Sequence, residues 1–253
     1  MLLSFLSKIT SRHSRIPKAV RIRTIMSSYQ AWTGGGLAST YHAESVSQRS
    51  KLADYAYNGR FDEALELIED NPELVNSWRL RDPNDTRPPS GWTTLHQAAL
   101  LSTSTISHIE RFVSLGAFRT LRTLNTNETA YDIAKKNQRS REILDALKPN
   151  HERQLDKQTI RNLQKALDEV VMSRVSSLIE RNKFRIPPVE ILLELPEPHV
   201  SCPIPGFYGG FYIELREDGC IQTESSCRVA GGSGQTHVIQ PDGTWKITAD
   251  GLY

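Results

Sequence analysis

Residues 91–99 read Gly-Trp-Thr-Thr-Leu-His-Gln-Ala-Ala, and this stretch decides the fold predicted for the middle of the chain. A threonine directly before a helical pattern of apolar residues is a typical N-cap, so we expect a helix to begin beside Thr93. Leu95 and Ala98-Ala99 then share one face, which is expected to pack on a neighbouring helix. A second helix is predicted from the apolar residues Ile109, Phe112 and Val113, which precede Gly116-Ala117.

The same unit of two helices returns on both sides of this stretch. On the C-terminal side, residues 129–134 (Thr-Ala-Tyr-Asp-Ile-Ala) predict a helix start, and further apolar residues follow at helical spacing at Ile143, Leu144 and Leu147. On the N-terminal side, two short helices are predicted from Leu52, Tyr55, Ala56, Phe61, Ala64, Leu65 and Ile68. Gly59 separates these two helices and Pro72 follows them, so the sequence predicts three helix pairs over 49–148.

The pattern of residues 93–99, closed by Gly116-Ala117, resembles the ankyrin repeat, whose first helix starts with T-P-L-H-x-A-A. The departures are clear, because Thr94 and Ala130 stand where the motif has proline, Asp132 replaces the histidine, and the first unit lacks the motif. The resemblance covers about 100 of the 253 residues. It implies three degenerate repeats stacked into an array, with loop tips and adjoining helices that bind a protein partner.

A long amphipathic helix is predicted next, over residues 153–182, within a segment that we place at 152–200. Its apolar stripe is wide enough to require burial against a neighbour, either the last repeat or the C-terminal unit. A coiled-coil dimer is an alternative, although the spacing does not hold strict heptads. Pro187-Pro188 ends the helix, and Pro196 and Pro198 predict an extended connector.

Residues 201–253 change to the period of two that is typical of strands. Phe211, Ile213 and Leu215 alternate with polar neighbours, and turns are predicted at 218–219, 231–234 and 241–243. About 50 residues are few for an independent core, so this small antiparallel β unit is expected to lean on the preceding helix. Its segments 205–210 and 231–235 resemble those that follow ankyrin repeats in uncharacterised proteins, and the resemblance implies no activity. The predicted fold class is mostly α.

The first 43 residues form a basic segment, with six of the 31 Lys and Arg residues and none of the 29 acidic ones. An amphipathic stretch rich in Arg and Ser and free of acids is the signature of a mitochondrial transit peptide, which predicts a mitochondrial location. A disordered basic tail, or a start at Met26, is the alternative, and the expected location is then cytoplasmic. Residues 27–43, which contain Gly34-Gly35-Gly36, are interpreted as a flexible linker.

The composition is that of a globular protein, with 38% hydrophobic and 24% charged residues. No apolar run approaches the ~20 residues of a membrane-spanning helix. Beyond residue 43, the remaining 25 basic and 29 acidic residues leave a net charge of −4, which disfavours nucleic acid as a partner. Three cysteines without a Cys-x-x-Cys pair indicate a reducing compartment. We expect a monomer without a cofactor.

Candidate binding residues gather around the long loop of residues 82–90. Large aromatic and arginine side chains are enriched at the hot spots of protein interfaces. Residues of these two kinds in and around this loop and the next one are Trp78, Arg79, Arg81, Trp92, Arg119 and Arg122. Either tryptophan has an alternative role, which is to pack the loop onto the array. On this basis we predict a non-catalytic interaction module, an adaptor or scaffold, for an unidentified protein partner.

Catalytic and metal-binding alternatives concentrate in the β unit. Possible metal ligands there are His199, Cys202, Cys220, Cys227 and His237, but the paired short spacings of a zinc site are missing, so no metal is expected. Cys227 and His237 would suit a nucleophile and its base, yet no third group orients them, and a structural cysteine and a surface histidine are expected instead. The second function considered is an enzyme or ligand-binding β unit that uses these two residues and Glu224, with the repeats presenting a protein substrate.

Overall fold

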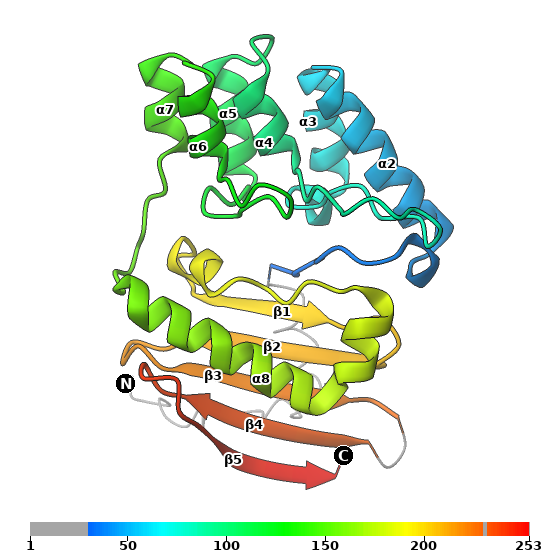
Figure 1. Cartoon of the computed structure of the whole chain (residues 1–253), viewed down its shortest axis with the longest axis vertical. Coiled ribbons are helices and arrows are strands. Elements are labelled where there is room, and N and C mark those ends of the chain that lie inside the picture. The colour runs from blue at the N-terminus through cyan, green and yellow to red at the C-terminus, as the bar shows by residue number, and fades with distance from the viewer. Residues whose placement is uncertain (1–29, 230–231, 253) are drawn as a thin grey trace, which may run out of the picture.

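Helix pairs and a sheet form two layers in the computed structural model, which describes residues 30–229 and 232–252 (Figure 1). Helices account for 42% of this described part and strands for 17%. The prediction of a mostly α protein is therefore wrong, and the fold is mixed α/β. The reason is that the strands form one sheet, and this sheet buries the longest of the described helices.

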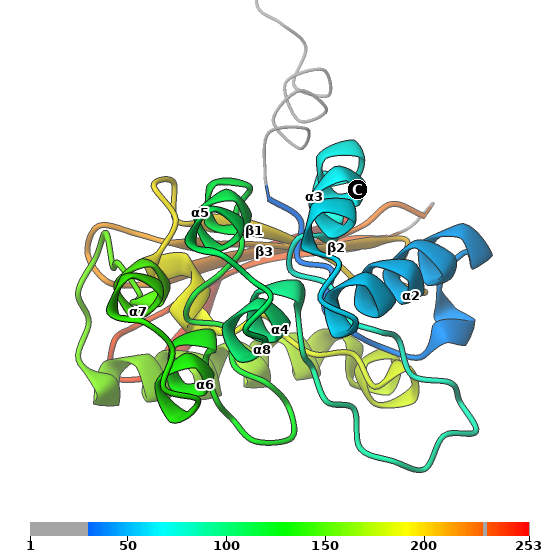
Figure 2. The same cartoon turned by 90° about the horizontal axis from the view of Figure 1, so that it is seen from above.

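The helical layer consists of three helix pairs. The pairs are α2 (Ala43–Tyr57) with α3 (Phe61–Asp70), α4 (Thr94–Leu100) with α5 (Ile106–Ser114), and α6 (Ala130–Lys136) with α7 (Arg141–Leu147). Figure 2 shows α2, α4 and α6 in one row and α3, α5 and α7 in a second row behind it. The two rows share a core of buried apolar residues that includes Leu52, Leu95, Ile109, Phe112 and Ile133. The helices predicted over 49–148 are thus present.

Threonines mark the starts of the first helices in the second and third pairs. Asp132 N donates a hydrogen bond to Thr129 Oγ1 (3.1 Å), and Thr129 N donates one to Asp132 Oδ2 (3.0 Å). At the start of α4, Thr93 N donates to His96 Nδ1 (3.1 Å), and the other ring nitrogen lies 3.0 Å from Leu121 O. Such bonds satisfy backbone groups that a helix start leaves free. Asp132 therefore has the same capping role as His96, although it departs from the repeat pattern.

The second layer is a five-stranded antiparallel meander with a long helix across one face (Figure 1). The strands are β1 (His199–Pro203), β2 (Gly209–Leu215), β3 (Ile221–Cys227), β4 (Ser233–Ile239) and β5 (Trp245–Leu252), and each pairs with the next. Strand β1 was not predicted, because its first residues belong to the segment predicted as an extended connector. An extended connector and a strand differ only in whether a partner strand lies beside them, which local sequence does not show.

The long helix of this layer is α8 (Lys157–Asn182), which was predicted over 153–182. It begins after Asp156, whose side chain accepts hydrogen bonds from Gln158 N (2.8 Å) and Thr159 N (3.0 Å). Its apolar stripe and the apolar residues of the sheet form one core, which includes Leu163, Leu167, Val170, Ile213 and Ile239. Of the two neighbours considered for this stripe, the C-terminal unit buries it.

The segment before α2 is not the flexible linker that its glycines predict. Trp32 is only 1% exposed, and its backbone N–H donates to Ser201 O (2.6 Å), so the chain runs beside β1. Gly35 lies so close to Trp78 that an added Cβ would be 2.2 Å from the indole nitrogen. Glycine is therefore needed here for close approach rather than for mobility. The linker prediction is therefore wrong for residues 30–43. The transit peptide predicted at 1–25 lies outside the described residues.

Candidate functional site

The loops that join successive helix pairs contact each other where the first of them returns to α4. Figure 2 shows them projecting on the side of α2, α4 and α6. Leu124 N donates a hydrogen bond to Ser90 O (2.8 Å), and Trp92 Nε1 donates one to Asn125 Oδ1 (3.2 Å), so the two loops hold each other. Leu124 is 40% exposed, and Trp92 is partly exposed and packs with its other side against the core of the helix pairs. We call Trp92, Leu124 and Asn125 the loop-tip patch.

Close packing fixes the orientation of the loop-tip patch. Gly91 has a φ of 66°, and an added Cβ would lie 2.6 Å from Leu124 Cγ. The ring of Trp92 lies 6.2 Å from the ring of His96, which is itself buried at the start of α4. Burial lowers the pKa of His96 to about 4, so the ring is neutral at physiological pH. An aromatic side chain and a leucine are therefore presented from a rigid base.

Two of the six residues predicted to bind a partner instead hold the layers together. Trp78 is 4% exposed, lies 6.1 Å edge-on from Trp32, and has the Arg185 guanidinium 5.7 Å from its ring centroid. The backbone N and the Nε of Arg119 donate to Glu194 Oε2 (3.1 and 3.3 Å). The Glu194 side chain is 6% exposed. Trp78 thus takes the packing role considered as the alternative for it, and Arg119 is committed to an internal ion pair.

The other predicted arginines lie at the surface, each with a partner inside the chain. Arg79 pairs with Asp54 of α2 (2.5 Å). Arg81 Nε donates to Asp85 O (2.7 Å), which shapes its own loop. Arg122 donates to Asn127 O (3.0 Å) of its own loop and lines a hollow that reaches α8. Of the six predicted residues, Trp92 therefore belongs to the loop-tip patch, and Arg122 lies on the same loop as Leu124 and Asn125.

A hollow of about 520 Å³ continues from the second loop down to α8. Arg122 and Asn127 line it from the loop, and Gln164, Asp168 and Met172 line it from α8. The remaining wall is the connector after the helix, with Phe184, Arg185, Ile186, Pro188 and Glu190. We call this hollow the interlayer groove. Its residues come from three separate parts of the chain, so no sequence motif could have marked it.

The charged groups of the interlayer groove differ in whether an oppositely charged group lies beside them. Arg185 Nη1 donates to Arg122 O (2.9 Å), and burial lowers the pKa of Arg185 to about 10, so it stays charged at neutral pH. Arg122 lies 3.8 Å from Glu190 and 3.6 Å from Asp132. Asp168 accepts a hydrogen bond from Gln164 Nε2 (2.9 Å), and within the described residues no basic side chain forms an ion pair with it. Burial raises the pKa of the Asp168 carboxyl.

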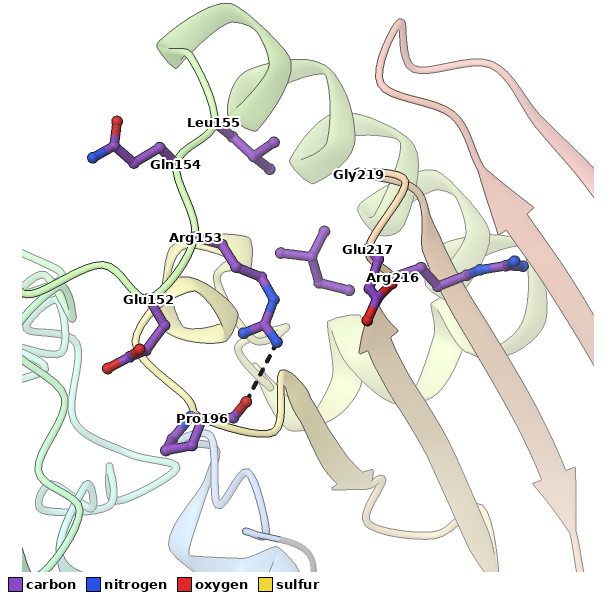
Figure 3. Close-up of a pocket in the computed structure, with 9 residues that line it drawn as sticks. Glu152, Arg153, Gln154, Leu155, Pro196, Arg216, Glu217 and Gly219 are labelled. Carbon is purple, nitrogen blue, oxygen red and sulfur yellow. Dashed lines mark hydrogen bonds between the residues drawn. The ribbon is translucent and has the colours of Figure 1, made fainter.

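A second hollow of about 470 Å³ lies where the segment before α8 meets the turn after β2 (Figure 3). Arg153 extends across it and donates to Leu195 O (3.1 Å) and Pro196 O (3.3 Å). Arg216 and Glu217 line the opposite wall, and Arg216 pairs with Asp218 (3.7 Å). Arg153 thus connects two segments of the chain and Arg216 pairs within its own turn, and we assign no ligand to this hollow.

The residues of the catalytic alternative do not converge. Thr223 pairs with His237 across the sheet, so Glu224, the next residue, projects from the opposite face. His237 is 1% exposed, which corrects the expectation of a surface histidine, while Glu224 is exposed. Cys227 Sγ donates to Phe207 O (3.2 Å). In the described part of the chain, no group of three or more His, Cys, Asp or Glu residues is arranged to hold a metal ion.

The chain was compared with family models, curated proteins and solved structures, and none of them matches it. Its function is therefore inferred from its own residues. Among the described helices, none has both the length and the apolar character needed to cross a membrane.

Proposed function

We propose that this protein is a non-catalytic protein-binding module, an adaptor or scaffold whose three degenerate ankyrin repeats present the loop-tip patch to a protein partner. The observation that carries the proposal is the contact between the two loops beside the start of α4, which holds Trp92 and Leu124 on the same side of the array. A tryptophan in a fixed orientation loses little conformational entropy on binding, and hot spots are enriched in this residue.

Support for the repeat assignment comes from the helix starts. The reciprocal bonds between Thr129 and Asp132 and the contact of Thr93 with His96 stand at equivalent positions of successive helix pairs. His96 also reaches Leu121 O in the following loop (3.0 Å), so one side chain ties the helix start of a unit to the loop after it. Such ties between neighbouring units are what a stacked repeat requires, since each unit is stabilised mainly by its neighbours.

The C-terminal layer favours the same function. It covers the side of the array loops that carries Trp78 and Arg119, and it leaves the loop-tip patch open. A layer that orders the loops lowers the cost of immobilising them when a partner binds. We further propose a mitochondrial location, on the basis of the acid-free basic segment at the N-terminus.

Partner capture with the full chain tests the proposal. A partner is first identified by cross-linking and mass spectrometry, and its affinity is then measured for purified variants. Trp92→Ala should weaken binding by more than about fivefold, which corresponds to about 1 kcal/mol for a hot-spot residue. Tyr57→Ala is the matched control, because this aromatic residue is 71% exposed at the far end of α2. Equal affinities for Trp92→Ala and Tyr57→Ala would refute the loop-tip proposal.

A further inference from the structure

The interlayer groove carries an inference about the chemistry of the partner. We propose that this groove receives an arginine side chain of the bound protein, with its guanidinium paired to Asp168. The inference rests on the proposed function, because the groove begins at Arg122 and Asn127, on the same loop as Leu124 and Asn125 of the loop-tip patch. A partner seated on the loop tips is therefore adjacent to the groove.

The Asp168 carboxylate is held in one orientation before any ligand arrives. Gln164 Oε1 accepts a hydrogen bond from Val189 N (2.7 Å), which fixes the amide so that its Nε2 points to Asp168 Oδ1 (2.9 Å). Both residues stand on α8, whose apolar stripe is buried in the core. In the described chain Asp168 Oδ2 accepts no hydrogen bond, so this oxygen is available to a donor from outside.

The charges around Asp168 favour the binding of a cation at its carboxylate. Arg122 lies between Glu190 and Asp132, and Arg185 donates to the neutral Arg122 O, so neither arginine of the groove forms an ion pair with Asp168 in the described residues. Lys165, which is close to Asp168 along the helix, pairs with Glu169 (3.8 Å). Asp168 thus has only a neutral amide as its partner, and a half-buried carboxylate gains most from a paired cation.

The walls of the groove suit the rest of an arginine side chain. Met172, Phe184, Ile186 and Pro188 provide apolar surface for its aliphatic part. A guanidinium is more weakly hydrated than an ammonium, so it loses less hydration when it enters a partly apolar groove. The volume of about 520 Å³ exceeds what one side chain needs, so the backbone of the partner also has room at the entrance.

A titration with n-propylguanidinium, a mimic of the arginine side chain, tests the inference. The full-length protein is followed by amide NMR, and chemical-shift changes should map to residues 164–172 and 184–190. Neutral n-propylurea, which has nearly the same shape, should bind at least tenfold more weakly. Equal binding of the two probes, or changes that map to the hollow around Glu152 and Glu217, would overturn the inference. Tighter binding of n-butylammonium would overturn the choice of arginine.

Two variants make the test specific to Asp168. Asp168→Asn should weaken n-propylguanidinium binding at least tenfold, while Asp145→Asn, which changes an exposed carboxylate on α7, should leave it unchanged. Met172→Lys places an internal cation one turn after Asp168 and should compete with the probe in the same way. Circular dichroism melting checks that each variant is folded. Binding that survives both Asp168→Asn and Met172→Lys would show that Asp168 is not the ligand.

The two proposals are separable by experiment. Trp92→Ala should lower the affinity for the protein partner and leave n-propylguanidinium binding in the groove unchanged. If the probe binds the groove but partner affinity does not depend on Trp92, the proposed function fails and the groove assignment stands. If partner affinity depends on Trp92 but the probe does not bind, the groove assignment alone fails.

Discussion

Replacing Trp32 by alanine should destabilise the protein strongly, although its sequence context predicts a linker. Trp32 is 1% exposed and packs edge-on against Trp78, so truncation removes a large buried side chain and leaves a cavity, at a cost of about 3–5 kcal/mol. The indole Nε1 also donates to Arg185 O (2.7 Å), and this carbonyl loses its partner in the variant. A loss of this size is a large part of the 5–15 kcal/mol typical of folded domains.

Urea unfolding of the full chain, followed by far-ultraviolet circular dichroism, measures this effect. Trp32→Phe keeps an aromatic ring but removes the donor, so it should cost less than Trp32→Ala, about 1–3 kcal/mol. Tyr57→Ala changes a 71% exposed aromatic residue and should stay within about 0.5 kcal/mol of the unaltered protein. A loss below about 1 kcal/mol for Trp32→Ala would refute the claim that residues 30–43 join the two layers.

Three further predictions concern the repeat core, the buried histidine and the N-terminal address. Leu95→Ala should cost about 2–5 kcal/mol in urea unfolding, because Leu95 is 1% exposed, and an unchanged midpoint would contradict its place in the core. His96 has a folded pKa of about 4 against about 6.5 when unfolded, so the unfolded chain binds more protons between these values. Stability should therefore fall by about 3 kcal/mol as the pH drops from 6.5 to 4, and unfolding curves of His96→Gln should lack this contribution. Residues 1–25 fused to a fluorescent protein should carry it to mitochondria unless Arg12, Arg15 and Lys18 are changed to Glu, and a diffuse cytosolic signal for the unaltered fusion would instead favour translation from Met26.

Much of the secondary structure could be predicted because it depends on neighbours in sequence. A threonine directly before apolar residues that recur every 3.6 positions predicts a helix start independently of the tertiary fold. Thr93 and Thr129 are examples. The alternation at Phe211, Ile213 and Leu215 predicted β2 for the same reason. The class was wrong because the predicted β unit was counted as a small addition to the helices, whereas it is a five-stranded sheet that includes the unpredicted β1 and buries α8.

The interlayer contacts could not be predicted, because they join residues far apart in sequence. A glycine-rich stretch such as the one around Gly35 has the same local sequence whether it is a flexible linker or packs closely against another segment. In this protein, Gly35 packs against Trp78. Glu194 and Arg119 meet only because the connector after α8 folds back under the array loops. A tryptophan in a loop is expected either at a binding hot spot or in packing of the loop onto the array. For Trp78, only its burial in the structure decides in favour of packing.

Hydrogen exchange of the full chain with and without its partner tests the central claim most directly. If the loop-tip patch and the interlayer groove are the binding surface, amides at 90–92, 122–127 and 184–190 should exchange more slowly in the complex. The exposed face of the sheet, which carries Glu224, and the edge strand β5 should be unaffected. Protection confined to the sheet face or to β5, with exchange at the loop tips unchanged, would contradict the account.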